Sequence, residues 1–142
     1  RPPRSTLFPY TTLFRSVGIE SEPGLVLRAR ANAERNGLTN IRFYRADLFA
    51  DQRGAAWQQL PYDRLLLDPP RAGAREILTG FGSKLPQRIV YISCHPATLA
   101  RDAGFLVHAR GYQLLSAGVL DMFPHTAHVE SMAVFVHAGG SA

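Results

Sequence analysis

The stretch from Ile89 to Asp102, IVYISCHPATLARD, constrains the fold of this chain more than any other. It opens with four apolar residues of the kind that a buried parallel strand contains. Pro96 suits the first position of a helix, where a missing N–H has no cost, and Gly111 suits its end. We therefore expect a strand, a short turn and a helix, which is the repeating unit of an α/β fold.

Cys94 is the only cysteine of the chain, and it falls in the turn between that strand and that helix. Ligands bind at the carboxyl ends of strands in open α/β sheets, and a helix N-terminus favours a thiolate over a thiol. An inert buried thiol is the alternative, because free cysteine is among the most buried residue types. The position in the turn favours Cys94 as a candidate nucleophile.

The length, cysteine count and net charge of the chain limit the classes of protein to which it can belong. Its 142 residues suffice for one modest domain, and no apolar run approaches the length that spans a membrane. A single cysteine excludes an internal disulfide framework and fits a reducing compartment, so we expect a cytoplasmic protein. The net charge is +5, but three of the 16 basic residues precede Val17, and without them it is +2, a weak argument for nucleic acid.

The first 16 residues, RPPRSTLFPYTTLFRS, do not fit the pattern that follows. They contain three prolines, show no regular period and lack the apolar core of a secretory signal. We interpret residues 1–16 as a non-native leader that resembles translated sequencing adapters, with a genuine disordered extension as the alternative. Residues 17–137 would then form the domain, and residues 138–142 a flexible tail.

Strand and helix patterns alternate through the domain, which predicts a mostly parallel, doubly wound sheet covered on both faces. Two final strands without a helix between them suggest an antiparallel end to the sheet. In such folds an acidic residue follows a glycine-rich loop by about 20 residues, but the first glycine of this chain is Gly18. We therefore expect a sheet truncated at its first strand and glycine loop. The expected strands cover residues 17–20, 41–44, 64–67, 89–92, 112–120 and 131–136. The first expected helix begins at Pro23 and is closed by Asn36-Gly37, the second covers residues 75–85, and the third begins at Pro96 and ends near Gly111. Ser21 and Pro23 are the expected cap and first residue of the first helix.

Three carboxylates follow expected strands and suit an adenosine cofactor. Glu20 could accept both ribose hydroxyls, and Asp47 could accept from the adenine amino group. A solvated surface residue is the alternative for Glu20, and a cap of the following turn for Asp47. Asp68 is the first residue of the sequence Asp68-Pro69-Pro70-Arg71. The two prolines fix the backbone there, and we expect the Asp68 carboxylate to face the cleft. A plain proline-rich turn is the alternative there.

Glu130 stands immediately before the last expected strand, 36 residues after Cys94. A carboxylate held at a strand end near a nucleophile can serve as a general base, although such a residue alone is more often a surface residue. His125 and His128 lack a partner at metal-ligand spacing, so we expect no metal site. Arg71, Arg101 and His125 are candidates for phosphate or loop contacts.

Three segments, LLLDPPRAGA, IVYISCHPATLARD and VLDMFPHTAHVESMAVF, resemble the carboxyl-terminal catalytic half of the RNA (uracil-5-)-methyltransferases, and most of all the 23S ribosomal RNA branch. The resemblance implies a Rossmann-like class I S-adenosylmethionine-dependent methyltransferase domain, of which residues 17–137 are a part. It implies that Cys94 is the nucleophile and Glu130 the general base. It also implies that Glu20, Asp47 and Asp68 lie at S-adenosylmethionine positions.

The activity that the resemblance implies is methylation of uracil C5 in ribosomal RNA through a covalent adduct between Cys94 and C6. Glu130 would remove the C5 proton. The implied partner is RNA, with no membrane and a monomeric protein, and an iron–sulfur cluster would belong only to the part of such an enzyme that precedes Val17. Two alternatives stay open: a catalytically inactive fragment of such an enzyme, and a base-nitrogen methyltransferase that uses Asp68-Pro69-Pro70. Against the second, Arg71 stands where an aromatic stacking residue would be expected.

Overall fold

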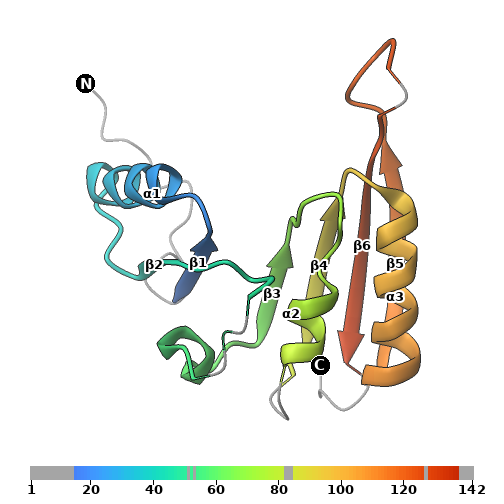
Figure 1. Cartoon of the computed structure of the whole chain (residues 1–142), viewed down its shortest axis with the longest axis horizontal. Coiled ribbons are helices and arrows are strands. Elements are labelled where there is room, and N and C mark those ends of the chain that lie inside the picture. The colour runs from blue at the N-terminus through green and yellow to red at the C-terminus, as the bar shows by residue number, and fades with distance from the viewer. Residues whose placement is uncertain (1–14, 51, 53, 82–84, 127, 138–142) are drawn as a thin grey trace, which may run out of the picture. The chain divides into compact units, whose positions relative to one another are not determined.

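The computed structural model describes residues 15–50, 52, 54–81, 85–126 and 128–137 (Figure 1). The predicted tail at 138–142 and all but the last two residues of the predicted leader lie outside these ranges. The chain divides into two compact units, Arg1–Gln59 and Leu60–Ala142. None of the helices in the described ranges is both long and apolar enough to cross a membrane.

The first unit contains a parallel strand pair and one helix. Strand β1 (Ser16–Glu20) pairs with β2 (Ile41–Arg45), and helix α1 (Pro23–Arg35) connects them. A 3₁₀ turn at Ala56–Gln59 follows β2 along the chain. Because Ser16 is the first residue of β1, the strand begins inside the predicted leader.

Helix α1 begins as expected at Pro23, but its N-cap is Glu22 rather than Ser21. The Glu22 carboxylate accepts hydrogen bonds from the N–H groups of Gly24 and Leu25, at 3.0 and 2.6 Å. The Ser21 hydroxyl donates instead to the side chain of Glu20 at 3.2 Å. The prediction of Ser21 as the cap was therefore wrong.

The second unit contains a four-stranded sheet in the order β3-β4-β6-β5 (Figure 1). β3 runs parallel to β4, whereas β6 runs antiparallel to both β4 and β5, which confirms the expected antiparallel end. Helix α2 is shorter than predicted, because it ends at Gly80, a poor helix former. The elements are β3 (Arg64–Leu67), α2 (Arg75–Gly80), β4 (Arg88–Ser93), α3 (Pro96–Arg110), β5 (Tyr112–Leu120) and β6 (Glu130–His137).

The core of the second unit lies between the sheet and its two helices (Figure 1). Alternate residues of the central strands, such as Tyr91 and Phe135, are fully buried there against Leu106 of α3. Ser93 and Ser131 are buried on the same face of the sheet. The opposite face is more open, and the side chain of Leu66 is 66% exposed on it. Within this unit the described helices α2 and α3 therefore cover one face of the sheet.

The hydrogen bonding of the described strands forms two sheets rather than one continuous sheet. β1 pairs only with β2, and β3 pairs only with β4, so each of these parallel strands keeps one edge without a strand partner among the described residues. Consequently the predicted site residues are divided between the units: Glu20 and Asp47 lie in the first, and Asp68, Cys94 and Glu130 in the second.

Candidate active site

The turn that carries Cys94 is held by the residues on both sides of it. The Ser93 hydroxyl donates to the carbonyl oxygen of His95 and accepts from its N–H, both at 3.1 Å. His95 is the N-cap of α3, and its Nδ1 accepts from the N–H of Thr98 at 3.3 Å. Cys94 is a free thiol of intermediate exposure. The sulfur is thus held in a defined turn without being sealed in the core.

Glu130 and Cys94 lie at the same end of the β4–β6 strand pair. β4 and β6 are antiparallel, and their register ends with Ser93 paired to Ser131. Cys94 directly follows Ser93 in the turn after β4, and Glu130 directly precedes Ser131 at the start of β6. The Ser131 hydroxyl donates to the carbonyl oxygen of Ser93 at 3.0 Å and ties the two strand ends together. Residues 36 apart in sequence are therefore neighbours at one end of the sheet.

The side chain of Glu130 is available for chemistry. Strand alternation directs it to the face opposite the buried Ser131, and the residue is of intermediate exposure. Among the described residues its carboxylate forms no hydrogen bond or ion pair. An unpaired carboxylate at the same end of the sheet as a free thiol suits proton removal near a nucleophile.

Asp68 leaves the sheet at the same end as Cys94. β3 and β4 are parallel with Leu67 paired to Tyr91, so the residues that follow both strands emerge at one edge. Asp68 is exposed, and it has no side-chain partner in the described part of the chain. The second unit thus gathers all three of its predicted site residues at one end of its sheet.

The loop after β3 and the segment before β6 meet at this end of the sheet. Arg71 Nη1, in the loop after β3, lies 3.4 Å from Nδ1 of His128, in the segment before β6. Both residues are exposed. Arg71 therefore keeps its expected place at the site, and its observed contact is with a loop residue.

Sequence reasoning missed Asp102, whose side chain is fully buried on α3. It pairs with Arg101, with 2.8 Å between Arg101 Nη2 and Asp102 Oδ1. Arg101 Nη2 also donates to the carbonyl oxygen of Ala72 at 2.9 Å, so Arg101 holds a loop and is engaged rather than free for phosphate. The missed signal was a carboxylate on the same helical stripe as Leu99 and Leu106, because a buried charge requires partners.

In the first unit, Glu20 and Asp47 follow the two parallel strands. Glu20 Oε1 accepts from the N–H groups of Ser21 and Glu22 at 2.7 and 2.9 Å. The hydrogen bond from Glu22, with those from Ser21, lowers the pKa of Glu20 against a smaller opposing effect of burial, so this group is ionised at neutral pH. Asp47 Oδ1 accepts from the N–H of Phe49 at 3.0 Å, which is the turn-capping alternative. The second oxygen of each carboxylate has no partner in the described residues.

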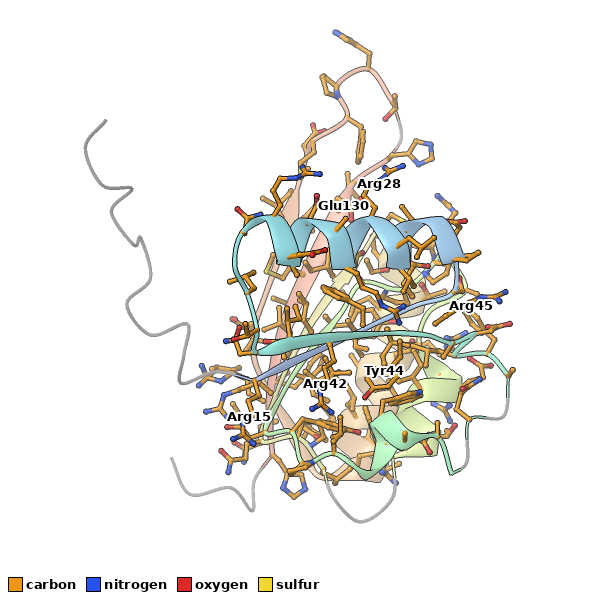
Figure 2. All side chains as sticks on the ribbon, turned by 90° about the vertical axis from the view of Figure 1, so that its left-hand side faces the viewer. Arg15, Arg28, Arg42, Tyr44, Arg45 and Glu130 are labelled. Atoms are coloured by element: carbon orange, nitrogen blue, oxygen red, sulfur yellow. The ribbon has the colours of Figure 1, made fainter. Side chains whose placement is uncertain are left out.

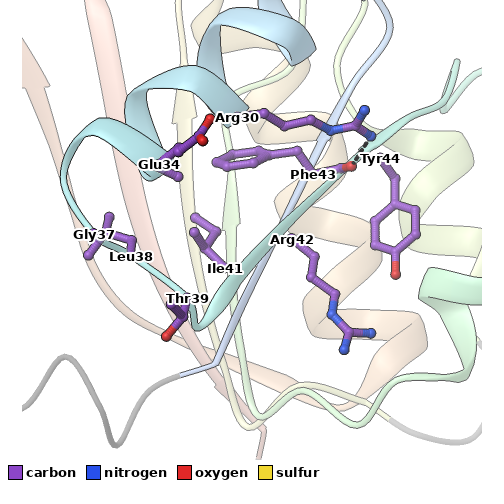
Figure 3. A pocket seen from close by; sticks show the side chains of 10 residues that line it. Arg30, Glu34, Gly37, Leu38, Thr39, Ile41, Arg42, Phe43 and Tyr44 are labelled. Carbon is purple, nitrogen blue, oxygen red and sulfur yellow. Dashed lines mark hydrogen bonds between the residues drawn. The ribbon is translucent and has the colours of Figure 1, made fainter.

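A hollow of about 530 Å³ lies along α1 and β2 of the first unit (Figure 3). Arg30 borders it and donates to the carbonyl oxygen of Phe43 at 2.6 Å. Arg42 and Tyr44 extend from β2 on the side away from α1 (Figures 2 and 3). None of the five predicted site residues lines this hollow.

Comparison with known proteins identifies the family. The sequence profile described as tRNA (Uracil-5-)-methyltransferase matches residues 12–138. The chain belongs to this family. Among curated members, it is 62% identical over 119 residues to the 23S rRNA (uracil(1939)-C(5))-methyltransferase RlmD of Xanthomonas oryzae pv. oryzae (strain MAFF 311018). It is equally similar to the RlmD of Stenotrophomonas maltophilia (strain R551-3). Each match covers 84% of this chain but only 27% of the relative.

Solved structures show that this uracil-5-methyltransferase family member has the class I methyltransferase fold. TYW2 of M. jannaschii in complex with AdoMet superposes with a TM-score of 0.60 at 18% identity, over 92% of this chain and 62% of that one. TrmK of M. capricolum in complex with S-adenosyl-homocysteine gives 0.64 at 13% identity, over 87% and 52%. NSun6 of Pyrococcus horikoshii gives 0.64 at 13% identity, over 89% and 42%. The expected α/β fold class is confirmed.

Proposed function

We propose that this chain carries the nucleophile and the general base of an enzyme that methylates C5 of a uracil in 23S ribosomal RNA. The observation that carries the proposal is the strand register that pairs Ser93 with Ser131, the residues directly adjacent to Cys94 and Glu130. The names of the relatives support the substrate, and the family supports the reaction.

The residues of the second unit suit each step of the reaction. The thiolate of Cys94 adds to C6 of the uracil and forms a carbon–sulfur bond, which turns the ring into an enolate with a nucleophilic C5. After C5 is methylated, the Glu130 carboxylate removes the C5 proton. The electron pair of that C–H bond re-forms the C5–C6 double bond and expels the thiolate. The base must leave its stack to reach the end of the sheet.

The acceptors present fit an adenosine-containing methyl donor. S-adenosylmethionine, when bound, supplies an electrophilic methyl group. The unpaired oxygens of Glu20 and Asp47, both in the first unit, would accept from its ribose hydroxyls and adenine amino group.

We propose further that the enzyme works as a monomer in the cytoplasm, away from membranes. The free thiol of Cys94 supports a reducing compartment, where such a thiol stays unoxidised. Sedimentation of the purified protein at several concentrations tests the monomeric state.

The decisive experiment measures transfer of a labelled methyl group from S-adenosylmethionine to a uridine-containing fragment of 23S ribosomal RNA. We expect Cys94→Ala to abolish both labelling and adduct formation. Glu130→Gln should form the adduct but fail to release it, whereas Glu76→Gln, an exposed carboxylate of α2, should behave as wild type.

Three results would contradict the proposal. Labelling that survives Cys94→Ala would exclude the covalent mechanism. Methylated adenine or guanine in the product would favour a base-nitrogen methyltransferase built on Asp68-Pro69-Pro70. A wild-type chain that transfers no methyl group would favour an inactive fragment.

A further inference from the structure

The carboxylate of Asp102 joins three elements of the second unit. Its Oδ2 accepts from the N–H of Ala74 at 2.8 Å and from the hydroxyl of Tyr91 at 2.7 Å. Its Oδ1 accepts from Nε of Arg101 at 2.9 Å. Ala74 precedes α2, Tyr91 lies in β4, and Asp102 and Arg101 lie in α3. One buried side chain therefore ties the start of α2 to the strand and the helix that flank Cys94.

The loop between β3 and α2 is fastened tightly against this carboxylate. Gly73 adopts a φ of +92°, and its N–H donates to the carbonyl oxygen of Pro70 at 2.9 Å. A Cβ atom on Gly73 would lie 2.6 Å from Asp102 Oδ2 and 2.5 Å from Arg101 Nη2. The loop backbone therefore approaches Asp102 so closely that only glycine fits.

Stability alone is a weak reason for this arrangement. Well-packed apolar residues often stabilise a core as much as a buried charged group does, because the charge must be removed from water. Burial, followed by the hydrogen bond to Asp102, raises the pKa of Tyr91, so its hydroxyl stays a donor. The polar cluster also orients the segments that it joins, because each of its hydrogen bonds holds a donor from a different segment in a fixed direction.

We propose that Asp102 is a positioning residue that fastens the loop of Asp68 and Arg71 beside the Cys94 turn. The inference rests on the proposed function, because it assigns the fastened loop to the methyl-transfer site. Asp68 and Arg71 stand six and three residues before Ala74, and Cys94 stands eight residues before Asp102. The carboxylate thus connects the two segments that carry site residues at the ends of β3 and β4.

The first test measures the loop itself by hydrogen exchange in the complete chain. Asp102→Asn keeps the size of the side chain but removes its charge, so we expect exchange of the Ala74 amide to accelerate at least about tenfold. The amide of Ile89, in the core strand, should keep its wild-type rate. The matched control is Asp63→Asn, whose side chain is 72% exposed at the surface of the same unit. An unchanged Ala74 amide in Asp102→Asn would overturn the proposal.

The second test is a double-mutant cycle on methyl transfer. If Asp102 acts through the loop, Asp102→Asn should lower kcat/KM by about tenfold or more in the wild-type background. In the Asp68→Ala background the same substitution should have little further effect. Losses that multiply in the double variant would indicate a merely structural role and overturn the proposal. Should Asp102→Asn fail to fold, Tyr91→Phe removes one donor and keeps the ring, and it should shift both measurements in the same direction.

The two proposals fail separately. A wild-type protein without methyl transfer would overturn the proposed function, while the Ala74 exchange rate would still test the fastening of the loop. An active wild type with an equally active Asp102→Asn would overturn only the positioning role.

Discussion

Two buried serines tie together the strand ends that carry Cys94 and Glu130. The Ser131 hydroxyl donates to the carbonyl of Ser93, and the Ser93 hydroxyl bonds the backbone of His95 on the far side of Cys94. Both serines are almost fully buried, so neither hydroxyl exchanges its protein partner for water at low cost. Small polar side chains thus fix the backbone on both sides of the Cys94 turn.

Ser131→Ala tests this bracing. Removing one buried hydrogen bond should lower the free energy of unfolding by about 1 kcal/mol. We expect kcat for methyl transfer to fall further than this stability loss explains, because Glu130 is the adjacent residue. Chemical denaturation and single-turnover kinetics measure the two effects. Ser116→Ala, an exposed serine on β5, is the control, and a wild-type kcat in Ser131→Ala would refute the bracing role.

At the scale of the elements, α3 connects the site to the core. It begins at Pro96, two residues after Cys94, and ends at Arg110, before Gly111 in the left-handed region at φ +72°. Leu99 and Leu106 bury its apolar stripe against the sheet. The position of the Cys94 turn therefore depends on how firmly this helix is anchored.

Two glycine substitutions in and after α3 should act in opposite directions. Gly111→Ala places a side chain at φ +72°, and we expect it to lower the free energy of unfolding by about 1 kcal/mol. Gly104→Ala meets no atom within 4 Å inside the helix and should raise it by up to about 1 kcal/mol. Thermal unfolding of the two variants measures the difference. Equal changes in the free energy of unfolding would show that the positive φ of Gly111 does not determine the stability of the C-terminal end of α3.

Element patterns were predictable where local signals suffice. Pro96 and Gly111 marked the ends of α3, and the apolar run at 64–67 marked β3 with its observed bounds. The missed features depend on tertiary contacts. Nothing local to Asp102 indicates that Ala74 and Tyr91 will surround it. Only the antiparallel register reveals that Cys94 and Glu130 come to the same end of the sheet.

At the scale of the whole molecule, the two units carry different ionisable groups and therefore different pH limits. The shifted carboxylate, Glu20, lies in the first unit, whereas the shifted phenols of Tyr62, Tyr91 and Tyr112 all lie in the second. The first unit also contains Trp57, the only tryptophan, which reports on it by fluorescence. Acid and alkaline unfolding can thus be followed unit by unit.

On the acid side, Glu20 should contribute to the stability of the first unit. Its folded pKa lies below the ordinary value of 4.5, so its contribution is present above that pH and is lost as the pH falls through the folded pKa. We expect the acid transition reported by Trp57 to shift to higher pH in Glu20→Gln. Glu34→Gln, an exposed carboxylate on α1, should leave it in place, and an unshifted transition in Glu20→Gln would contradict the prediction.

On the alkaline side, the buried phenols should limit the second unit. The Tyr112 hydroxyl donates to the carbonyl oxygen of Pro86 at 2.7 Å, and burial raises the pKa of Tyr112 to about 12. An unfolded tyrosine releases its proton near its ordinary value of 10, so stability is complete below pH 10 and falls as the pH rises toward 12. Phenolate absorbance during denaturation at rising pH measures this decline. Tyr112→Phe should make it shallower, and Tyr44→Phe in the first unit should not; equal slopes in the two variants would mean that the buried hydroxyl ionises without unfolding.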